Sequence, residues 1–320
     1  MFEKLKYKFK MTKEKFVSLI IVLKTEYLKE KKLENASKRK LNLMYIRKIL
    51  TNPKRLFDVL RGKKLYVPYV EIVITTTCTL KCQGCSALMG YYSNPQHMDP
   101  KDIINALNNL LESVDSINFL HLLGGEPLTY PYLYEILEFA KSQEKIKYVA
   151  IVTNGTLTIK DDRIINILKD GKFFVSISDY GEISRNYNQL IRQLKENKIM
   201  YKPMSKNYKW IDYGGFDKRS RTDKEFKNQF FACTHKRVSM LNGKLFKCFR
   251  CSHATNLNLI ELKEKDYINF NKNKAEKKDV YNFIYNYYDC TEACKYCDCI
   301  KNAKTLTRGA QIKNKNEVKI

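Results

Sequence analysis

The sequence of 320 residues lacks any apolar run long enough to cross a membrane. Its longest apolar run, residues 16–23, is interrupted by Ser18 and falls far short of the roughly 20 residues that a transmembrane helix needs. Lys15 and Lys24 flank this run without a small-residue cleavage site, which argues against a secretory signal. Glycine and proline are also few, at 12 and 7 residues against 44% apolar residues, which excludes collagen-like and disordered chains. We therefore expect a globular, cytoplasmic protein.

Acidic residues are scarce, since 34 Asp and Glu stand against 59 Lys and Arg and the net charge is +25. Such an excess attracts nucleic acid, anionic lipid or phosphorylated molecules. The excess is mostly Lys, in a chain also rich in Asn, Ile and Tyr, which is the composition that an AT-rich coding bias produces. We interpret the charge as a solvated surface and expect no specific nucleic-acid partner.

Cysteine is absent from residues 86–232, so the ten cysteines fall into two groups. Disulfides do not persist in the cytoplasm, and we expect these residues to be metal ligands or redox groups. The first group is Cys78, Cys82 and Cys85, and the second is Cys233, Cys248, Cys251, Cys290, Cys294, Cys297 and Cys299. This grouping predicts two metal centres, one in each of two domains.

Residues 1–66 are rich in Lys and carry apolar residues at helical spacing, such as Phe16, Leu19 and Leu23. The pattern predicts a basic helical arm that covers one end of the following domain. Contact of its cationic side with an anionic membrane surface is the alternative interpretation.

From residue 67 to 205, short apolar or β-branched runs alternate with helical patterns. Asp99 and Pro100, for example, supply an N-cap and a first-turn proline for one helix. The alternation predicts right-handed βαβ units in an α/β fold, with functional groups at the carboxyl ends of the parallel strands. The predicted strands are residues 70–75, 117–123, 147–152, 173–178 and 199–202, and the predicted helices are residues 100–113, 131–142, 161–169 and 183–197.

The alternation stops after residue 205, and we interpret residues 206–232 as a linker. Asn242-Gly243 lies between two short apolar runs and is a strong signal for a two-residue hairpin turn. The hairpin and the cysteines after it predict a small α+β domain at residues 233–308, followed by a frayed tail at 309–320.

The first cysteine group has the spacing Cys78-x3-Cys82-x2-Cys85 and lies just past a predicted strand. Three thiolates at this spacing can surround one compact metal centre. A closed structural site needs four protein ligands, whereas three leave one coordination position open. Zinc is the alternative, although the nearest histidine, His97, lies twelve residues further on.

Together with Gly124-Gly125-Glu126-Pro127 after the second predicted strand, this spacing resembles the paired signature of the radical S-adenosylmethionine (SAM) superfamily. The resemblance covers about residues 68–205 and implies a partial (β/α)6 barrel. It also implies a 4Fe-4S cluster on the three thiolates, with SAM completing the coordination of the fourth iron. One electron, from a flavodoxin- or ferredoxin-type donor, then cleaves SAM to a 5′-deoxyadenosyl radical that removes a hydrogen atom from a substrate carbon.

The resemblance assigns cofactor-binding roles at the strand ends. Glycine at 124 and 125 lets the backbone approach the methionine part of SAM, and Glu126 accepts a hydrogen bond from its ammonium group. Ser176 and Ser178 correspond to the position that contacts the ribose.

Three further polar residues follow predicted strands. Asn154 follows the third strand and suits either a cofactor contact or a turn. Asp179 and Tyr180 follow the fourth strand and are the candidates for proton transfer, with a turn at residues 179–181 as the alternative.

The residue before the third cysteine departs from the family pattern. It is usually aromatic there and stacks near the adenine, but here it is Gly84. Tyr91 and Tyr92 are the candidates to replace that surface.

The spacing Cys233-x9-Gly243-x4-Cys248 resembles the hairpin half of an auxiliary-cluster extension called SPASM, or of its shorter relative called twitch. The resemblance implies a second 4Fe-4S cluster over the barrel mouth. Two further thiolates are needed, for which we choose Cys294 and Cys297. Two auxiliary clusters and a structural zinc site remain open alternatives, because this choice leaves Cys251, Cys290 and Cys299.

Together, the two resemblances imply a radical SAM oxidoreductase that acts on a carbon–hydrogen bond, and we expect a saccharide or an aminocyclitol as its substrate. A peptide substrate is the alternative within the class, and residues 1–66 lack the strand pattern of a peptide-docking module. A zinc-structured nucleic-acid-binding protein is the alternative from another class.

Overall fold

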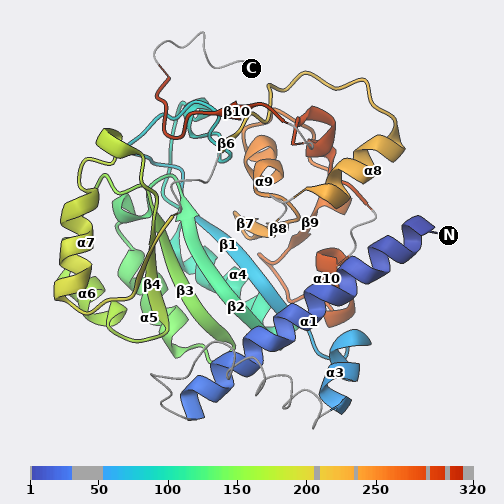
Figure 1. The fold of residues 1–320 in the computed structure, drawn as a ribbon, viewed down its shortest axis with the longest axis horizontal. Coiled ribbons are helices and arrows are strands. Elements are labelled where there is room, and N and C mark those ends of the chain that lie inside the picture. The colour runs from blue at the N-terminus through green and yellow to red at the C-terminus, as the bar shows by residue number, and fades with distance from the viewer. Residues whose placement is uncertain are drawn as a thin grey trace.

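One eight-stranded sheet forms the centre of the molecule (Figure 1), with the strand order β5-β4-β3-β2-β1-β7-β8-β9. The computed structural model describes residues 2–30, 53–204, 210–233, 237–285, 289–299 and 303–312. Neighbours from β5 to β7 are parallel, and β8 and β9 are antiparallel additions. The strands of the sheet are β1 (Tyr66–Thr75), β2 (Ser116–Gly124), β3 (Ile146–Thr153), β4 (Phe173–Ile177), β5 (Tyr201–Pro203), β7 (Ser239–Leu241), β8 (Lys244–Phe246) and β9 (Tyr267–Asn269). The predicted α/β class with a largely parallel sheet is confirmed.

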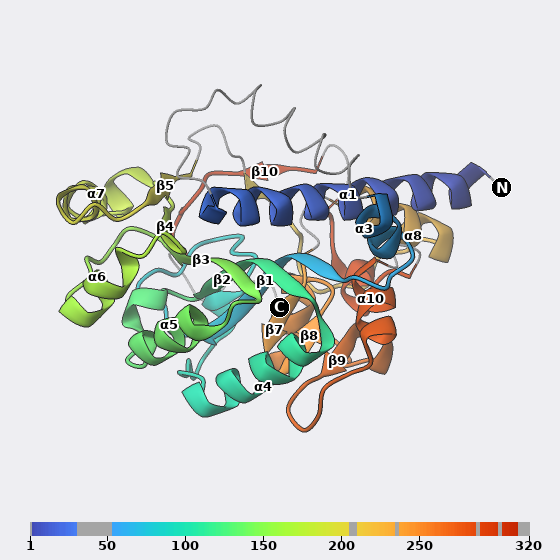
Figure 2. The same cartoon turned by 90° about the horizontal axis from the view of Figure 1, so that it is seen from below.

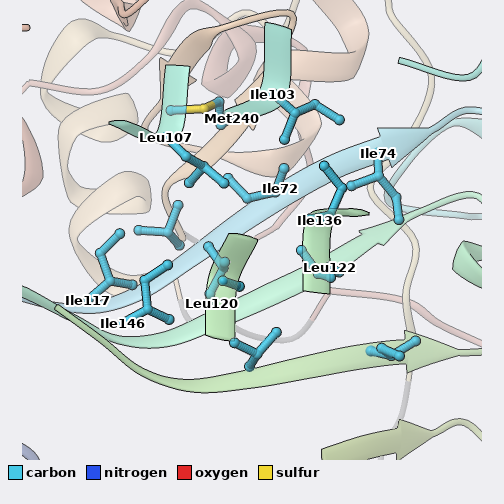
Figure 3. Close-up of a cluster of buried hydrophobic side chains, with 14 of the residues drawn as sticks. Ile72, Ile74, Ile103, Leu107, Ile117, Leu120, Leu122, Ile136, Ile146 and Met240 are labelled. Atoms are coloured by element: carbon cyan, nitrogen blue, oxygen red, sulfur yellow. The ribbon is translucent and has the colours of Figure 1, made fainter. Parts of the chain in front are cut away.

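Helices between successive strands cover the outer face of the sheet. Side chains alternate between the two faces of a strand, so Ile72, Leu120 and Leu122 point outward and pack near Ile103 and Leu107 (Figure 3). Burying each such side chain stabilises the fold by roughly 1.5–3 kcal/mol. These helices are α4 (Pro100–Ser113), α5 (Leu133–Ser142), α6 (Asp162–Leu168) and α7 (Tyr187–Glu196). The prediction of strands alternating with helices between residues 67 and 205 is confirmed.

The sixth parallel strand of the sheet comes from the cysteine-rich region. β7 pairs with β1, in the register Glu71↔Ser239 and Ile72↔Met240. The βαβ alternation of residues 67–205 supplies five parallel strands, and β7 extends the sheet on the other side of β1. The hairpin that carries Cys248 is therefore continuous with the central sheet.

The hairpin turn at Asn242 and Gly243 has the predicted form. Both residues have left-handed backbone conformations, with φ of 49° and 67°, as a two-residue turn between twisted strands requires. The turn joins β7 and β8, which pair in the register Ser239↔Phe246.

Helix α1 (Phe2–Glu30) lies on the face of the sheet opposite α4 and α5 (Figure 2). Leu19, Val22 and Leu23 are buried against Val59 of α3 (Pro53–Leu60) and Tyr66 of β1. The α1 backbone also accepts a hydrogen bond, since the side chain of Asn118 donates to the carbonyl of Ser18 at 3.2 Å. These contacts make the arm a cover for the inner face of the sheet near the amino ends of its strands, and residues 31–52 of the arm lie outside the described residues. No described helix is both long and apolar enough to span a bilayer.

The segment read as a linker contains helix α8 (Asp223–Ala232). Thr222 and Glu225 form a capping box, in which the Thr222 side chain accepts from the Glu225 N–H and the Glu225 side chain accepts from the Thr222 N–H. The pattern Thr-x-x-Glu is visible in the sequence and marks the start of this helix.

The remaining elements surround the cysteines and the loops at the strand ends. Helices α9 (Phe249–Asn256) and α10 (Lys277–Tyr285) belong to the cysteine-rich region, and β6 (Trp210–Ile211) pairs with β10 (Thr305–Leu306). Short 3-10 helices are η1 (Met89–Tyr91), η2 (Pro127–Thr129), η3 (Gly181–Ile183), η4 (Glu264–Asp266) and η5 (Glu292–Tyr296). The tail expected to fray from residue 309 is ordered as far as Ile312, because residues 310–312 bond to the loop after β1. Residues 313–320 lie outside the described residues.

Candidate active site and cysteine clusters

A cavity of about 450 Å³ lies at the carboxyl ends of the parallel strands. One wall is the loop after β1, which carries the first cysteine group. The strand ends form the floor, and residues of the cysteine-rich region form the opposite wall. Predicted site residues that line this cavity are Cys78, Cys82, Cys85, Gly124, Gly125, Asn154, Ser176, Ser178, Tyr180 and Cys248.

The thiols of Cys78, Cys82 and Cys85 all face this cavity. Burial raises the pKa of the Cys78 and Cys82 thiols to about 12, and it also raises the pKa of Cys85. A thiol must lose its proton to bind a metal, so binding of a cation here offsets the cost of placing negative sulfur in a buried site.

The spacing of the thiols indicates whether they can hold a single metal ion or a cluster. Across the described ranges, no three His, Cys, Asp or Glu side chains lie at the spacing that holds a single metal ion. An iron–sulfur cluster takes its thiolates on several irons, so its ligands face a common cavity rather than a common point. The three thiols fit such a cluster and leave one iron without a ligand from this loop.

Amide groups donate hydrogen bonds to two of these sulfurs. The Leu80 N–H and the Asn154 side-chain amide lie 3.5 and 3.7 Å from Cys78 Sγ. The side-chain amide of Gln311 lies 3.3 Å from Cys82 Sγ. Such donors stabilise negative charge on sulfur and orient the thiol.

The two glycines after β2 allow close packing between the ends of β1 and β2. The Gly125 N–H donates to Thr75 O and the Glu126 N–H to Thr77 O, both at 2.8 Å. A Cβ atom at Gly124 or Gly125 would overlap the carbonyl oxygen of Thr75 or Thr77, and Gly124 has φ of 139°. The absence of side chains here therefore lets the loop that carries the first cysteine group lie close against the end of β2.

The Glu126 carboxylate is fully buried and bonds to the chain itself. It accepts hydrogen bonds from Thr153 Oγ1 at 2.7 Å, the Asn154 N–H at 2.8 Å and the Leu128 N–H at 3.1 Å. Burial raises its pKa to about 7 against the lowering effect of these donors. Glu126 therefore ties the end of β2 to the end of β3, while Pro127 begins η2 beside it.

Asn154 is also held by the chain. Besides its contact with Cys78, its side-chain amide donates to Thr79 Oγ1 at 3.1 Å. Its side-chain oxygen accepts from the Thr156 N–H at 2.9 Å. The residue thus connects the end of β3 to the first cysteine loop.

The polar residues at the end of β4 separate into two sets. Ser176, Ser178 and Tyr180 line the cavity, and the Tyr180 ring packs edge-on against Trp210 at a centroid distance of 5.5 Å. Burial raises the pKa of Tyr180, which keeps its hydroxyl protonated. Asp179 is not part of the lining, and its carboxylate accepts from the Gly181 N–H at 2.9 Å, as in a turn.

Three further polar side chains, which were not selected from the sequence as site residues, line the same cavity. Glu71 is 7% exposed, and its carboxylate lies 3.4 Å from Arg237 Nη1. His121 is next to Glu71 across the β1–β2 ladder, and burial, then the charges of Arg237 and Lys202, lowers its pKa to about 4. A sequence signal existed, because Glu71 interrupts a β-branched run that otherwise reads as fully apolar.

Arg250 belongs to the opposite wall of the cavity and is 5% exposed. Its guanidinium lies over the ring of Phe216 at 4.4 Å and donates to the carbonyl of Gly214 at 2.9 Å. Its Nε has no hydrogen-bond partner in the described part of the chain. A buried donor without a partner is a group that a bound ligand can satisfy.

Comparison with known proteins identifies the domain that carries this cavity. The model of the Radical SAM superfamily matches residues 72–192. The chain contains a radical SAM domain. Members of this enzyme superfamily use a 4Fe-4S cluster and SAM, and the matched region includes all three cysteines of the first group and the two glycines.

Curated relatives of the radical SAM domain match part of the chain. GTP 3′,8-cyclase of Chlorobaculum tepidum is 31% identical over 108 residues, which are 33% of this chain and 31% of that protein. Molybdenum cofactor biosynthesis protein 1 of Bos taurus is 27% identical over 136 residues, which are 41% of this chain and 20% of that protein. The chain thus spans less than a third of the length of these relatives.

Solved structures with a similar fold have low sequence identity. BtrN in complex with AdoMet and 2-DOIA has a TM-score of 0.46 and 14% identity, covering 79% of this chain and 98% of that one. Native anSMEcpe with bound AdoMet has a TM-score of 0.47 and 14% identity, covering 77% and 92%. SuiB of Streptococcus suis bound to the precursor peptide SuiA has a TM-score of 0.35 and 20% identity, covering 50% and 37%. Because these TM-scores are below 0.5 and the identities are low, the likeness to these structures indicates neither a substrate nor a reaction for this chain.

Beyond the matched radical SAM region, four thiols of the second cysteine group gather near the cavity. Cys233 Sγ and Cys299 Sγ are 3.5 Å apart, and both residues pack with Cys297 around Tyr213. Burial raises the pKa of Cys248 to about 12, and the neighbouring thiols of Cys233 and Cys297 add to this rise. Cys248 itself lines the cavity of the radical SAM domain.

Of the other three cysteines, Cys251 and Cys294 are buried and Cys290 is partly exposed. Cys294 is 9% exposed, and its Sγ lies 3.6 Å from Thr291 Oγ1. Cys251 is fully buried, with its Sγ 4.0 Å from the Asp266 carboxylate. The structure therefore places Cys299, which was left over in the sequence analysis, against Cys233. Cys294 packs in the hydrophobic core and also lies near Cys248 and Cys297, since burial, then these neighbouring thiols, raises its pKa.

A charged network holds the loop that carries Cys297 and Cys299. Asp298 accepts from Arg219 Nη2 and from Arg221 Nη2, both at 2.8 Å, and the arginine charges lower its pKa. The Cys297 carbonyl accepts from Arg221 Nη1 at 3.0 Å. No local pattern in the sequence marks these residues, because they come from different segments.

Proposed function

We propose that this protein is a radical SAM oxidoreductase that removes a hydrogen atom from a carbon of a small polar substrate. The observation that carries the proposal is the convergence of three thiols, two glycines and the polar strand ends on one cavity of about 450 Å³. When bound, the cluster supplies the electron that cleaves SAM to methionine and a 5′-deoxyadenosyl radical.

Different residues of the chain bind the cluster and SAM. Cys78, Cys82 and Cys85 hold the cluster, and Gly124 and Gly125 line the adjoining wall, where we expect the methionine part of SAM. Ser176 and Ser178 are positioned to contact the ribose, and Tyr180 is the candidate for proton transfer. Glu126 and Asn154 act through the strand ends that they tie together, because their polar atoms bond mainly to the chain.

Polar and charged side chains that line the cavity indicate the class of substrate. Glu71, Arg237 and the neutral His121 offer charged and uncharged hydrogen-bonding groups in a largely buried site. Arg250 adds an unpaired Nε donor. Such groups suit a molecule with several hydroxyl, amino or acidic substituents. These features favour a saccharide or an aminocyclitol over a peptide.

We further propose a SPASM- or twitch-like role for the second cysteine group. Cys233, Cys248, Cys297 and Cys299 form the ligand set that the contacts favour for one auxiliary 4Fe-4S cluster, with Cys294 as the alternative to Cys299. When bound, such a cluster supplies a one-electron acceptor beside the cavity. An external donor of flavodoxin or ferredoxin type would supply the first electron, and the net charge of +25 favours an acidic partner.

Anaerobic reconstitution with iron and sulfide tests the proposal. Reduced protein mixed with SAM should release 5′-deoxyadenosine. Cys78→Ser should abolish release, whereas Cys290→Ser, at a cysteine away from the first loop, should not. A colourless protein that binds zinc, contains no acid-labile sulfide and yields no 5′-deoxyadenosine would refute the proposal and favour the nucleic-acid-binding alternative.

A further inference from the structure

Residues 303–312, here called the C-terminal strap, run back from the second cysteine group to the loop that carries the first. The strap begins at β10, which pairs with β6. It ends antiparallel to the first cysteine loop, with the Gln83 N–H donating to Ala310 O at 2.6 Å and the Ile312 N–H to Lys81 O at 2.8 Å. Cys82 and Gln311 form the bridge between these two hydrogen bonds.

The side chain of Gln311 is held on both sides. Its oxygen accepts from the Lys81 N–H at 2.9 Å. Its nitrogen donates to Gly309 O at 2.6 Å and to Cys82 Sγ at 3.3 Å. Exchanging the oxygen and the nitrogen would place two donors face to face at Lys81, so the contacts themselves direct the N–H groups toward the sulfur.

The strap also accounts for the glycine before the third cysteine. A Cβ atom at Gly84 would overlap the Leu306 side chain, and Gly84 has φ of 67°. Leu306 therefore takes the space into which a side chain at position 84 would point. The candidates expected to replace an aromatic residue there lie elsewhere, since Tyr91 packs edge-on with Phe216 and Tyr92 bonds His253 Nδ1 at 2.8 Å.

We propose that the C-terminal strap is part of the cluster site, and that Gln311 is a positioning residue whose amide donates to the Cys82 thiolate and raises the reduction potential of the cluster. The inference rests on the proposed function, because it requires a 4Fe-4S cluster on the first cysteine group. Reduction adds negative charge to the cluster and its sulfurs, and a donor aimed at a ligating sulfur stabilises that charge. Cys82 is 7% exposed, so little water competes for the sulfur.

Two substitutions at Gln311 separate the hydrogen bond from the shape of the side chain. Gln311→Glu keeps an oxygen that accepts from Lys81 but removes both N–H donors and adds negative charge. Gln311→Leu removes the polar contacts without adding charge. The control is Gln189→Leu, a glutamine on the exposed side of α7.

The measurement is an anaerobic redox titration of the full-length reconstituted protein, followed by EPR of the signal that changes when SAM is added. Gln311→Leu should shift the midpoint potential of that signal to more negative values, and Gln311→Glu should shift it further. Gln189→Leu should leave it unchanged. Equal potentials in all four proteins would overturn the inference.

Iron and sulfide content separates the possible failures. If the wild-type protein holds no cluster, or no signal responds to SAM, the proposed function fails. If the wild type responds to SAM but both Gln311 variants lose their iron, the tuning role is refuted in favour of a purely structural one. If only Gln311→Leu loses iron, the midpoint potential of Gln311→Glu is the test. A more negative potential supports the tuning role, and an unchanged potential refutes it.

Discussion

The thiols of Cys78, Cys82 and Cys85 come from one loop after β1, whereas the second cysteine group is gathered from three separate segments. The first loop lies between the ends of β1 and β2, where backbone bonds from Gly125 and Glu126 fix it. The second group depends on the β7–β8 hairpin, α8 and the loop around Asp298 coming together. A site within one loop can be recognised from spacing, whereas an assembled site depends on contacts that spacing does not reveal.

Loss of one cysteine from each group should have very different consequences. Cys82→Ala should abolish 5′-deoxyadenosine formation, because the proposed SAM-binding cluster loses one of its three thiolates. Cys248→Ala should retain SAM cleavage without substrate and lose the proposed second cluster. Assays of 5′-deoxyadenosine, with iron content as the control, check both expectations. If Cys248→Ala also abolished cleavage, the two groups would not be independent sites.

The ligand set of the assembled site can be sharpened with two serine substitutions. Cys299→Ser should lower the iron content by roughly half, because its sulfur lies 3.5 Å from that of Cys233. Cys294→Ser should retain the iron. If Cys294→Ser lost iron and Cys299→Ser retained it, Cys294 and Cys297 would be the pair that completes the ligand set with Cys233 and Cys248.

The free energy of unfolding should depend on pH through His121, on the sheet side of the cavity. Because burial lowers the pKa of His121 from 6.5 to about 4, the folded protein binds fewer protons than the unfolded chain between these values. His121 therefore contributes stability above pH 6.5 that is lost as the pH falls toward 4, by about 3 kcal/mol. Urea unfolding at several pH values should show a weaker acid destabilisation in His121→Gln. An unchanged slope in that variant would contradict the burial of this side chain.

The charged network at Asp298 should have the smallest effect on stability. Its carboxylate is about one-third exposed, so solvent screens the ion pairs, and Asp298→Ala should lower the free energy of unfolding by about 1 kcal/mol. The variant should also bind the second cluster less well, because the loop of Cys297 and Cys299 loses its anchor. Asp162→Ala, at an exposed site on α6, is the control for both measurements. Full iron occupancy in Asp298→Ala would show that the loop is held by other contacts.

Much of the central fold was predictable because its signals are local. The strands and helices between β1 and β5 follow from the hydrophobic period and from N-caps such as Asp99, and the Asn242-Gly243 turn predicts the β7–β8 hairpin in the same local way. The place of β7 beside β1 was not predictable, because pairing between distant strands has no local pattern. Helix α8 was missed although the capping box of Thr222 and Glu225 is visible in the sequence.

The residues of the candidate site also divide into those that the sequence predicted and those that it did not. The sequence predicted the residues that line the cavity from the strand ends, such as Gly124, Ser176 and Tyr180. It did not select Glu71, whose burial depends on the sheet around it, or Gln311, which lies far from Cys82 along the chain. It gave Glu126 a ligand-binding role, and it did not predict that Thr153 Oγ1 and the N–H groups of Asn154 and Leu128 donate to this carboxylate.

Residues a few positions apart specify the alternation of strands and helices, the three-thiol loop and the glycine pair, so these features can be recognised in the sequence. Three other features appear only in the folded chain: which thiols of the second group meet, the extension of the central sheet by β7, and the contact of the C-terminal strap with the first cysteine loop. They depend on contacts between distant segments, which the packing of the whole chain fixes and no short pattern encodes.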